Sequence, residues 1–489
     1  MPAYFKLIFN RFCGFVSLMA ILSISSSGTM AQVETPPAPS APRPVKVPPV
    51  HEAKLKNGLK VAVVQNHSSP LVTVWLLVDA GANFDGADKA GLANITASML
   101  TKGTKARSAT KIAEDIAFLG GTLDTDANWN SSVVTVTVTS DKLAQAMAIL
   151  ADVFSNPSFD EKELELLKTQ TLDGLAYSLK QPSSLANYVA SKYSFGEHPA
   201  GGTPESIKSI TAADVRKFYD SYYSSGPAVV IFTGDITPAK ARTLSAKYFS
   251  VKSGRGYGAG GIRSGSVPTS TVGSILVVDL PNSGQASVGY YVKRDGIGRN
   301  SQDFYPASVM NSILGGGYSS RLNQEIRIKR GLSYGAGSSL AWRSDSANFS
   351  ARAQTKNESA GEVAALLVTE LDKIRTKIVT PAELTPRKAV LIGSFGRGLE
   401  TTSDLAMQLG SLYSFSMPTS ELNKYVGSVE AVSAEQVKAV ADKLFVNGDL
   451  IIVGDYSVFK DDLAKRFPKL KPKVIAADKL DLSSLMLQK

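Results

Sequence analysis

The chain repeats one order of segments in its two halves. Thr211 and Ser433, 222 residues apart, each precede an apolar-periodic helix. A hydroxyl side chain in that position is typical of a helix N-cap. Each helix is followed by a turn, an apolar strand and a Gly-Asp pair, Gly234-Asp235 in the first half and Gly454-Asp455 in the second. A repeat of this length predicts two homologous lobes.

The fronts of the two halves also correspond. Residues 58–81 and 273–296 each read as a strand, a turn and a second, alternating strand. Residues 122–139 form a further strand pair, whereas 143–180 and 360–400 are helical in pattern. Helices that alternate with hairpins predict an α+β fold. We expect two homologous lobes, each a mostly antiparallel sheet flanked by helices, which form a clamshell around a cleft.

The N-terminal residues have the pattern of a secretory signal. Lys6 and Arg11 precede an apolar run, and small residues follow up to Ala31. The alternative is an uncleaved anchor, although the run is short for a membrane span. We expect an exported protein of the bacterial periplasm without a stable membrane span. The predicted parts are a signal peptide (1–31), a Pro-rich, solvated leader (32–50), an N-terminal lobe (51–250), a Gly/Ser-rich linker (251–272), a C-terminal lobe (273–470) and a C-terminal tail (471–489).

Composition excludes several classes of function. The formal charge is +10, or +8 without the signal, and no run of five or six like charges occurs, so the sequence does not indicate nucleic-acid binding. The single cysteine, Cys13, lies within the signal. The mature chain therefore cannot form disulfides or use a cysteine nucleophile or zinc ligand.

Common catalytic motifs are also absent from the sequence. His51, His67 and His198 are the histidines, and no two have the spacing that places them on one face of a helix. The chain has no Gly-x-Ser-x-Gly motif. The triplet Gly315, Gly316 and Gly317 suggests a phosphate loop, but no Gly-Lys-Ser/Thr follows it.

The segment after the glycine triplet carries two candidate donors. We expect Ser319 or Ser320 to cap a helix that ends at Gly331, with Arg327 near its end and Tyr334 just beyond. A guanidinium and a phenol that converge could both donate hydrogen bonds to a carbonyl oxygen or an oxyanion. The alternative for this segment is a solvated arginine and a packed tyrosine.

Residues 51–470 resemble the pitrilysin/insulinase-like zinc peptidases, and most closely the subgroup of mitochondrial processing peptidase. The stretch GLANITASMLTKGT (91–104) lines up without a gap on the family's GLAHFLEHMLFKGT-type helix. That helix carries the inverted His-x-x-Glu-His zinc motif. The resemblance places Asn94 and Ser98 at the histidine ligands, Ala97 at the catalytic glutamate and Gly174 at the distal glutamate ligand. It therefore implies a chain that binds no zinc and is not active alone.

The resemblance also implies roles for residues of the second lobe. Arg327 and Tyr334 keep the spacing of the family's Arg/Tyr pair, which holds the scissile carbonyl, and the glycine triplet matches a substrate-handling loop. Some bacterial relatives are heterodimers that divide the zinc and this pair between two subunits. The expected function is therefore a zinc-free subunit of a heterodimeric zinc metalloendopeptidase. Its expected partners are a homologous, zinc-bearing subunit and an unfolded peptide substrate. The alternatives are a noncatalytic, chaperone-like peptide-binding protein and a structural scaffold.

Overall fold

The computed structural model describes residues 44–86, 88–224, 228–249, 270–484 and 486–488. The predicted signal peptide, the leader as far as residue 43 and the linker as far as residue 269 lie outside these residues. The chain divides into two units, Met1–Pro44 and Val45–Lys489, and every described helix and strand belongs to the second. None of the described helices is both long enough and apolar enough to cross a bilayer.

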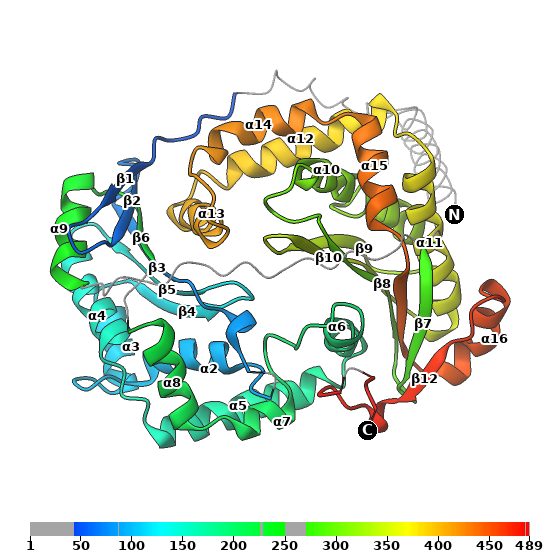
Figure 1. Ribbon diagram of the computed structural model, residues 1–489, viewed down its shortest axis with the longest axis horizontal. Helices are drawn as coiled ribbons and strands as arrows, with labels where there is room; N and C mark the ends of the chain where they lie inside the picture. The colour runs from blue at the N-terminus through cyan, green and yellow to red at the C-terminus, as the bar shows by residue number, and fades with distance from the viewer. Residues whose placement is uncertain (1–43, 87, 225–227, 250–269, 485, 489) are drawn as a thin grey trace, which may run out of the picture. The chain divides into compact units, whose positions relative to one another are not determined.

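The strands of the first half form a sheet that has six strands among the described residues (Figure 1). Its order is β1-β2-β6-β3-β5-β4, and only the β2–β6 pair is parallel. The strands are β1 (His51–Lys54), β2 (Lys60–Gln65), β3 (Leu71–Val78), β4 (Thr122–Ala127), β5 (Ser132–Thr139) and β6 (Val229–Gly234).

The second half builds a sheet of the same plan, again with six strands in the described part of the chain. Its order is β12-β7-β11-β8-β10-β9, and β7 is parallel to both β11 and β12. The strands are β7 (Val272–Asp279), β8 (Ala286–Asp295), β9 (Ala336–Trp342), β10 (Ser346–Thr355), β11 (Gly448–Gly454) and β12 (Lys473–Ala476). The two sheets differ at one edge, where β1 comes from the start of the repeat and β12 from the end of the chain. The predicted α+β fold of two homologous lobes is confirmed.

Helices flank both sheets (Figure 1). The first half contains α2 (Leu92–Met99), α3 (Ala109–Phe118), α4 (Leu143–Ser155), α5 (Glu161–Ser178), α6 (Pro182–Tyr193), α7 (Pro204–Ser209), α8 (Ala212–Tyr222) and α9 (Pro238–Tyr248). The second half contains α10 (Phe304–Leu314), α11 (Ala360–Thr376), α12 (Pro381–Arg397), α13 (Thr402–Ser414), α14 (Glu421–Ala431), α15 (Ala434–Leu444) and α16 (Tyr456–Arg466). Short 3₁₀ turns lie at Ala82–Phe84, Leu100–Lys102, Asn357–Ser359 and Ala477–Lys479, and Asn323–Ile328 is a π-helix.

The two halves exchange helices. Helix α13 of the second half packs on β3 and β6 of the first sheet, and α6 of the first half packs on β8 and β11 of the second. At the start of α13, the Thr402 hydroxyl lies 2.8 Å from that of Thr73, and the Thr402 carbonyl accepts a hydrogen bond from Thr233 at 2.7 Å. Each sheet is thus covered on one face by its own helices and on the other by a helix of the opposite half. This explains why β6 is buried along its whole length.

The sequence repeat is visible in equivalent contacts. Thr211 and Ser433 each form a capping box at the start of α8 and α15. The two aspartates of the Gly-Asp pairs hold the turn between the first two long strands of their sheets. Asp235 lies 2.5 Å from His67 in the β2–β3 turn, and Asp455 accepts the backbone N–H of Asn282 in the β7–β8 turn. The repeat therefore preserves the contacts that close each hairpin onto the sheet.

The two ends of the second unit pack more closely than the sequence suggested. Val45, Val47 and Val50, from the leader that we expected to be solvated, lie against an apolar cluster that includes residues of α13. In the segment that we expected to be a tail, β12 joins the second sheet, and Leu482 and Leu487 are buried against α6 and that sheet. Burial of these aliphatic side chains favours the observed arrangement over solvated segments.

Helix α2 begins after a glycine in the left-handed backbone conformation. Gly91 has a φ of +92°, and a Cβ there would lie 2.8 Å from Cδ1 of Ile207. The carboxylate of Asp85 accepts the backbone N–H groups of Gly91 and Ala93, both at 2.8 Å. Burial nevertheless raises the pKa of Asp85 to about 7, against the opposing effect of these hydrogen bonds. The protonation of Asp85, which bonds to the N-terminus of α2, therefore changes as the pH rises through about 7.

We predict that Thr211→Ala and Ser433→Ala each lower the free energy of unfolding by about 1 kcal/mol, because each removes the side-chain acceptor of a capping box. Guanidinium-induced unfolding measures the change. Thr369→Ala is the control, because its exposed hydroxyl bonds to a carbonyl within α11 and caps nothing. Equal effects of all three substitutions would contradict the role of the caps.

We also predict that Asp85→Asn weakens the pH dependence of stability. The folded protein retains a proton on Asp85 up to about pH 7, whereas the unfolded chain releases it near 3.8. The stabilising contribution of Asp85 is therefore complete below pH 3.8 and is lost as the pH rises through 7. Between pH 5 and 8, the melting temperature of Asp85→Asn should fall less than that of the wild type. Asp461→Asn, at an exposed position of α16, is the control, and a slope unchanged by Asp85→Asn would refute the prediction.

Candidate functional site

The residues on α2 do not fit a zinc ion. Asn94 uses its amide to donate a hydrogen bond to the carbonyl of Ala200 at 2.9 Å. Ala97 is 1% exposed within the first core and has no donor atom in its side chain. Ser98 is partly buried, and Gly174 is exposed on α5. Zinc in proteins requires thiolate, imidazole or carboxylate ligands. No group of three or more histidine, cysteine, aspartate or glutamate side chains suited to a metal occurs among the described residues.

Helix α2 retains the packing of an internal helix. Leu92, Ile95, Met99 and Leu100 belong to the first hydrophobic core. The helix contacts α5, α8 and the β4–β5 hairpin, and Asn94 connects it to the segment between α6 and α7. The helix therefore has a structural role in the lobe that requires no metal.

The second candidate site lies on one continuous segment of the second half. Helix α10 ends at Leu314, and the glycine triplet leads into a short helical turn and then the π-helix. Within it, the backbone N–H of Lys329 bonds to the carbonyl of Gln324, five residues earlier. The predicted helix is thus present in a wider form, which often occurs at functional sites.

The expected capping by Ser319 or Ser320 is wrong. The Ser320 hydroxyl donates to the carbonyl of Gly317 at 2.5 Å, and the Ser319 hydroxyl accepts a hydrogen bond from Arg387 at 3.0 Å. Neither side chain accepts a hydrogen bond from the N-terminal turn among the contacts of the described residues. Both serines instead fix the conformation of the glycine loop, because their hydroxyls bond to that loop and to α12.

Two of the three glycines are required by close packing. A Cβ on Gly315 would lie 2.2 Å from the backbone nitrogen of Ser338 in β9, and one on Gly316 would lie 2.8 Å from the Cα of Ser312. The carbonyl of Gly315 accepts the N–H of Ser338 at 3.1 Å. A Cβ on Gly317 would approach no atom more closely than 3.8 Å. Packing therefore accounts for Gly315 and Gly316, whereas Gly317 is free of this constraint.

Arg327 differs from the other cations of its segment. Lys329 and Arg330 both pair with Glu325, and the pKa of that carboxyl lies below its ordinary range because of the two cations. The Arg327 side chain is exposed and has no hydrogen bond or ion pair within the described part of the chain. Its guanidinium lies over the ring of Tyr318, 5.1 Å from the centroid. The five N–H donors of Arg327 are therefore available to a ligand.

Tyr334 is exposed on the same segment. It lies between the π-helix and β9, and its side chain is 89% exposed. The packed tyrosine that was the alternative interpretation is therefore not observed. Its phenol is therefore open to a ligand or a partner. Sequence reasoning missed Tyr318, which is 65% exposed between the glycine triplet and Arg327, because an isolated aromatic residue carries no signal of exposure.

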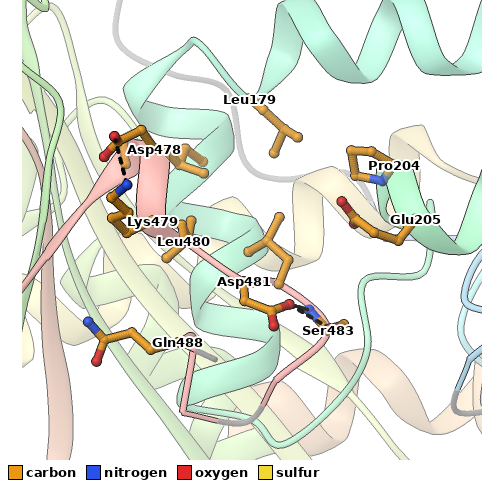
Figure 2. A pocket seen from close by; sticks show the side chains of 12 residues that line it. Leu179, Pro204, Glu205, Asp478, Lys479, Leu480, Asp481, Ser483 and Gln488 are labelled. Atoms are coloured by element: carbon orange, nitrogen blue, oxygen red, sulfur yellow. Dashed lines mark hydrogen bonds and ion pairs between the residues drawn. The ribbon is translucent and has the colours of Figure 1, made fainter.

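A separate cavity of about 930 Å³ contains none of these candidate residues (Figure 2). Its lining comes from the end of α5, from α6 and α7, and from the C-terminal segment between Ala477 and Gln488. Lys479 lies 3.8 Å from Asp478, and Asp481 accepts a hydrogen bond from Ser483 at 2.5 Å. These contacts pair four of the polar side chains of the lining with each other.

Comparisons with known proteins identify the family of the chain. The model of the insulinase family (peptidase family M16) matches residues 60–193, and the model described as "Peptidase M16 inactive domain" matches 209–391. An uncharacterised zinc protease of Rickettsia felis is 26% identical, over 80% of this chain and 94% of the relative. One of Mycobacterium leprae is 28% identical, over 80% of this chain and 88% of the relative.

Solved structures extend the similarity to the fold. The peptidase M16 inactive domain from Pseudomonas fluorescens superimposes with a TM-score of 0.74 at 27% identity and covers 83% of this chain and 98% of its own. A protease from Helicobacter pylori has the same fold, with a TM-score of 0.73 at 20% identity, and covers 83% of this chain and all of its own. The protein therefore belongs to the insulinase-like M16 peptidase family.

Proposed function

We propose that the protein is an exported, zinc-free subunit of a heterodimeric metalloendopeptidase. The observation that carries the proposal is the contrast between its two candidate sites. Helix α2 has no residue that could bind zinc or activate water, whereas Arg327 and Tyr334 are exposed and retain unused donors. A homologous, zinc-bearing subunit would supply the metal and the general base. The M16 family membership of this chain supports such a pairing.

Arg327 and Tyr334 would orient an unfolded peptide and stabilise the charge that develops on its carbonyl oxygen. A guanidinium and a phenol donate hydrogen bonds without a change in their own protonation, so they suit an oxyanion at neutral pH. The pairing of Lys329 and Arg330 with Glu325 favours this role. Within the described segment 323–336, the Arg327 guanidinium is then the cationic side chain that has no ion pair.

The subunit assignment is tested by reconstitution. This chain, a homologue from the same organism that carries His-x-x-Glu-His, and their mixture are each assayed on unfolded peptides, and zinc is measured in each purified protein. We expect cleavage only by the mixture and zinc only in the homologue. Activity with stoichiometric zinc in this chain alone would overturn the proposal. If no mixture were active but this chain still bound peptides, the chaperone-like function would replace it.

Substitutions in the mixture test the two donors. Arg327→Ala and Tyr334→Phe should each lower kcat by about 10²- to 10³-fold, the cost typical of losing one oxyanion donor. Arg327→Lys should restore only part of kcat, because an ammonium retains the charge but loses the planar fork. Arg330→Ala is the matched control, because that guanidinium already pairs with Glu325 at 2.7 Å. Equal effects of Arg327→Ala and Arg330→Ala would contradict a specific role for Arg327.

A further inference from the structure

Asn323 is a buried polar residue at the centre of the candidate site. It is the first residue of the π-helix and is 4% exposed, between the fully buried side chains of Leu322 and Ile326. An apolar residue would satisfy this packing at no cost in polar burial. The side-chain amide of Asn323 therefore calls for a reason beyond core packing.

The amide of Asn323 joins two segments that flank Arg327. Its Nδ2 donates to the backbone carbonyl of Tyr318 at 2.5 Å, and its Oδ1 accepts the backbone N–H of Ala336 at 3.3 Å. Tyr318 directly follows the glycine triplet, and Ala336 is the first residue of β9, two residues after Tyr334. One side chain thus connects the glycine loop, the π-helix and the segment that carries Tyr334.

The Tyr318 ring extends this connection to the guanidinium. Arg327 lies four residues after Asn323 on the π-helix, and its guanidinium lies 5.1 Å from the centroid of the Tyr318 ring. Because Asn323 bonds to the carbonyl of Tyr318, it restrains the backbone from which this ring extends to the cation. A cation over an aromatic face is held without using its N–H donors. The donors of Arg327 therefore stay available while its position is restrained.

We propose that Asn323 is a positioning residue that sets the placement of Arg327 relative to Tyr334. The Tyr318 ring supports the Arg327 guanidinium in this arrangement. The inference depends on the proposed function of the Arg327–Tyr334 pair. Both donors must reach the same peptide carbonyl, and small misplacements of a catalytic group reduce rates steeply. A buried amide with both its donor and its acceptor engaged favours a single arrangement of the three segments.

The first test compares two buried asparagines. Asn357 is 8% exposed and also joins two backbone groups, the carbonyl of Ser283 at 2.7 Å and the N–H of Asp455 at 3.0 Å, but these belong to the β7–β8 turn and the β11–α16 junction. In the reconstituted heterodimer, Asn323→Leu should lower kcat by about 10- to 100-fold with little change in KM. Asn357→Leu should lower the melting temperature without this loss of kcat. Equal losses of kcat would overturn the proposal.

The second test uses an exposed position that cannot disrupt the core. Tyr318→Phe retains the ring under Arg327 and should retain kcat, whereas Tyr318→Leu removes the aromatic face and should lower kcat. If Asn323→Leu does not fold, Asn323→Asp takes its place. This variant preserves the side-chain shape and the oxygen that accepts the N–H of Ala336, but an oxygen replaces the NH2 group that donates to Tyr318. A wild-type kcat in both Tyr318→Leu and folded Asn323→Asp would refute the proposal.

The third test separates positioning from general stability. If Asn323 acts through the donor pair, Asn323→Leu should cause little further loss of kcat in an Arg327→Ala/Tyr334→Phe background. A purely structural role would lower the residual rate by the same factor in both backgrounds, which would refute the inference. If Arg327→Ala and Tyr334→Phe themselves leave kcat unchanged, the proposed function fails. If they lower kcat but folded Asn323→Leu does not, only the inference about Asn323 fails.

Discussion

Burial of the second face of each sheet by a helix from the opposite half is the constraint on which the fold depends. A sheet covered on one face only would leave apolar strands such as β6 in contact with water. Helix α13 covers β3 and β6, and α6 covers β8 and β11. The contacts of Thr402 with Thr73 and Thr233 show that polar groups as well as apolar ones are matched across this boundary. Each half therefore completes the other.

Packing within the first lobe explains why a helix without zinc ligands is retained. The apolar residues of α2 are part of the first core, so the helix contributes to stability whatever its polar positions carry. At those positions Asn94 now bonds to the backbone at Ala200, and Ala97 fills space. In the second half, Arg327 and Tyr334 are exposed and do not belong to the hydrophobic core. Packing thus accounts for what remains on α2, whereas the role of Arg327 and Tyr334 depends on the proposed contact with a peptide.

Much of the fold could be predicted from the sequence, because short-range sequence patterns indicate its helices, strands and turns. The caps at Thr211 and Ser433, the strand pairs and the Gly-Asp turns all depend on short-range chemistry that repeats in the two halves. The exchange of α6 and α13 could not be predicted, since an amphipathic helix does not specify which sheet it covers. The π-helix was missed for a similar reason: its wider turn depends on contacts with β9 and the glycine loop. Asn323 carried a faint signal as a polar residue between Leu322 and Ile326, but its two backbone partners lie on other segments.

Because each half covers a sheet of the other, the two halves are held together by non-covalent contacts as well as by the peptide chain. Each half alone lacks the helix that covers the second face of its sheet, so each half made by itself would expose an apolar face. The two halves supplied as separate polypeptides would together contain every layer of the intact molecule. The contacts of α6 and α13 with the opposite sheets are non-covalent, so they could form between the two polypeptides. The protein therefore resembles an internal dimer, in which the path of the backbone between the halves matters less than the pairing of their surfaces.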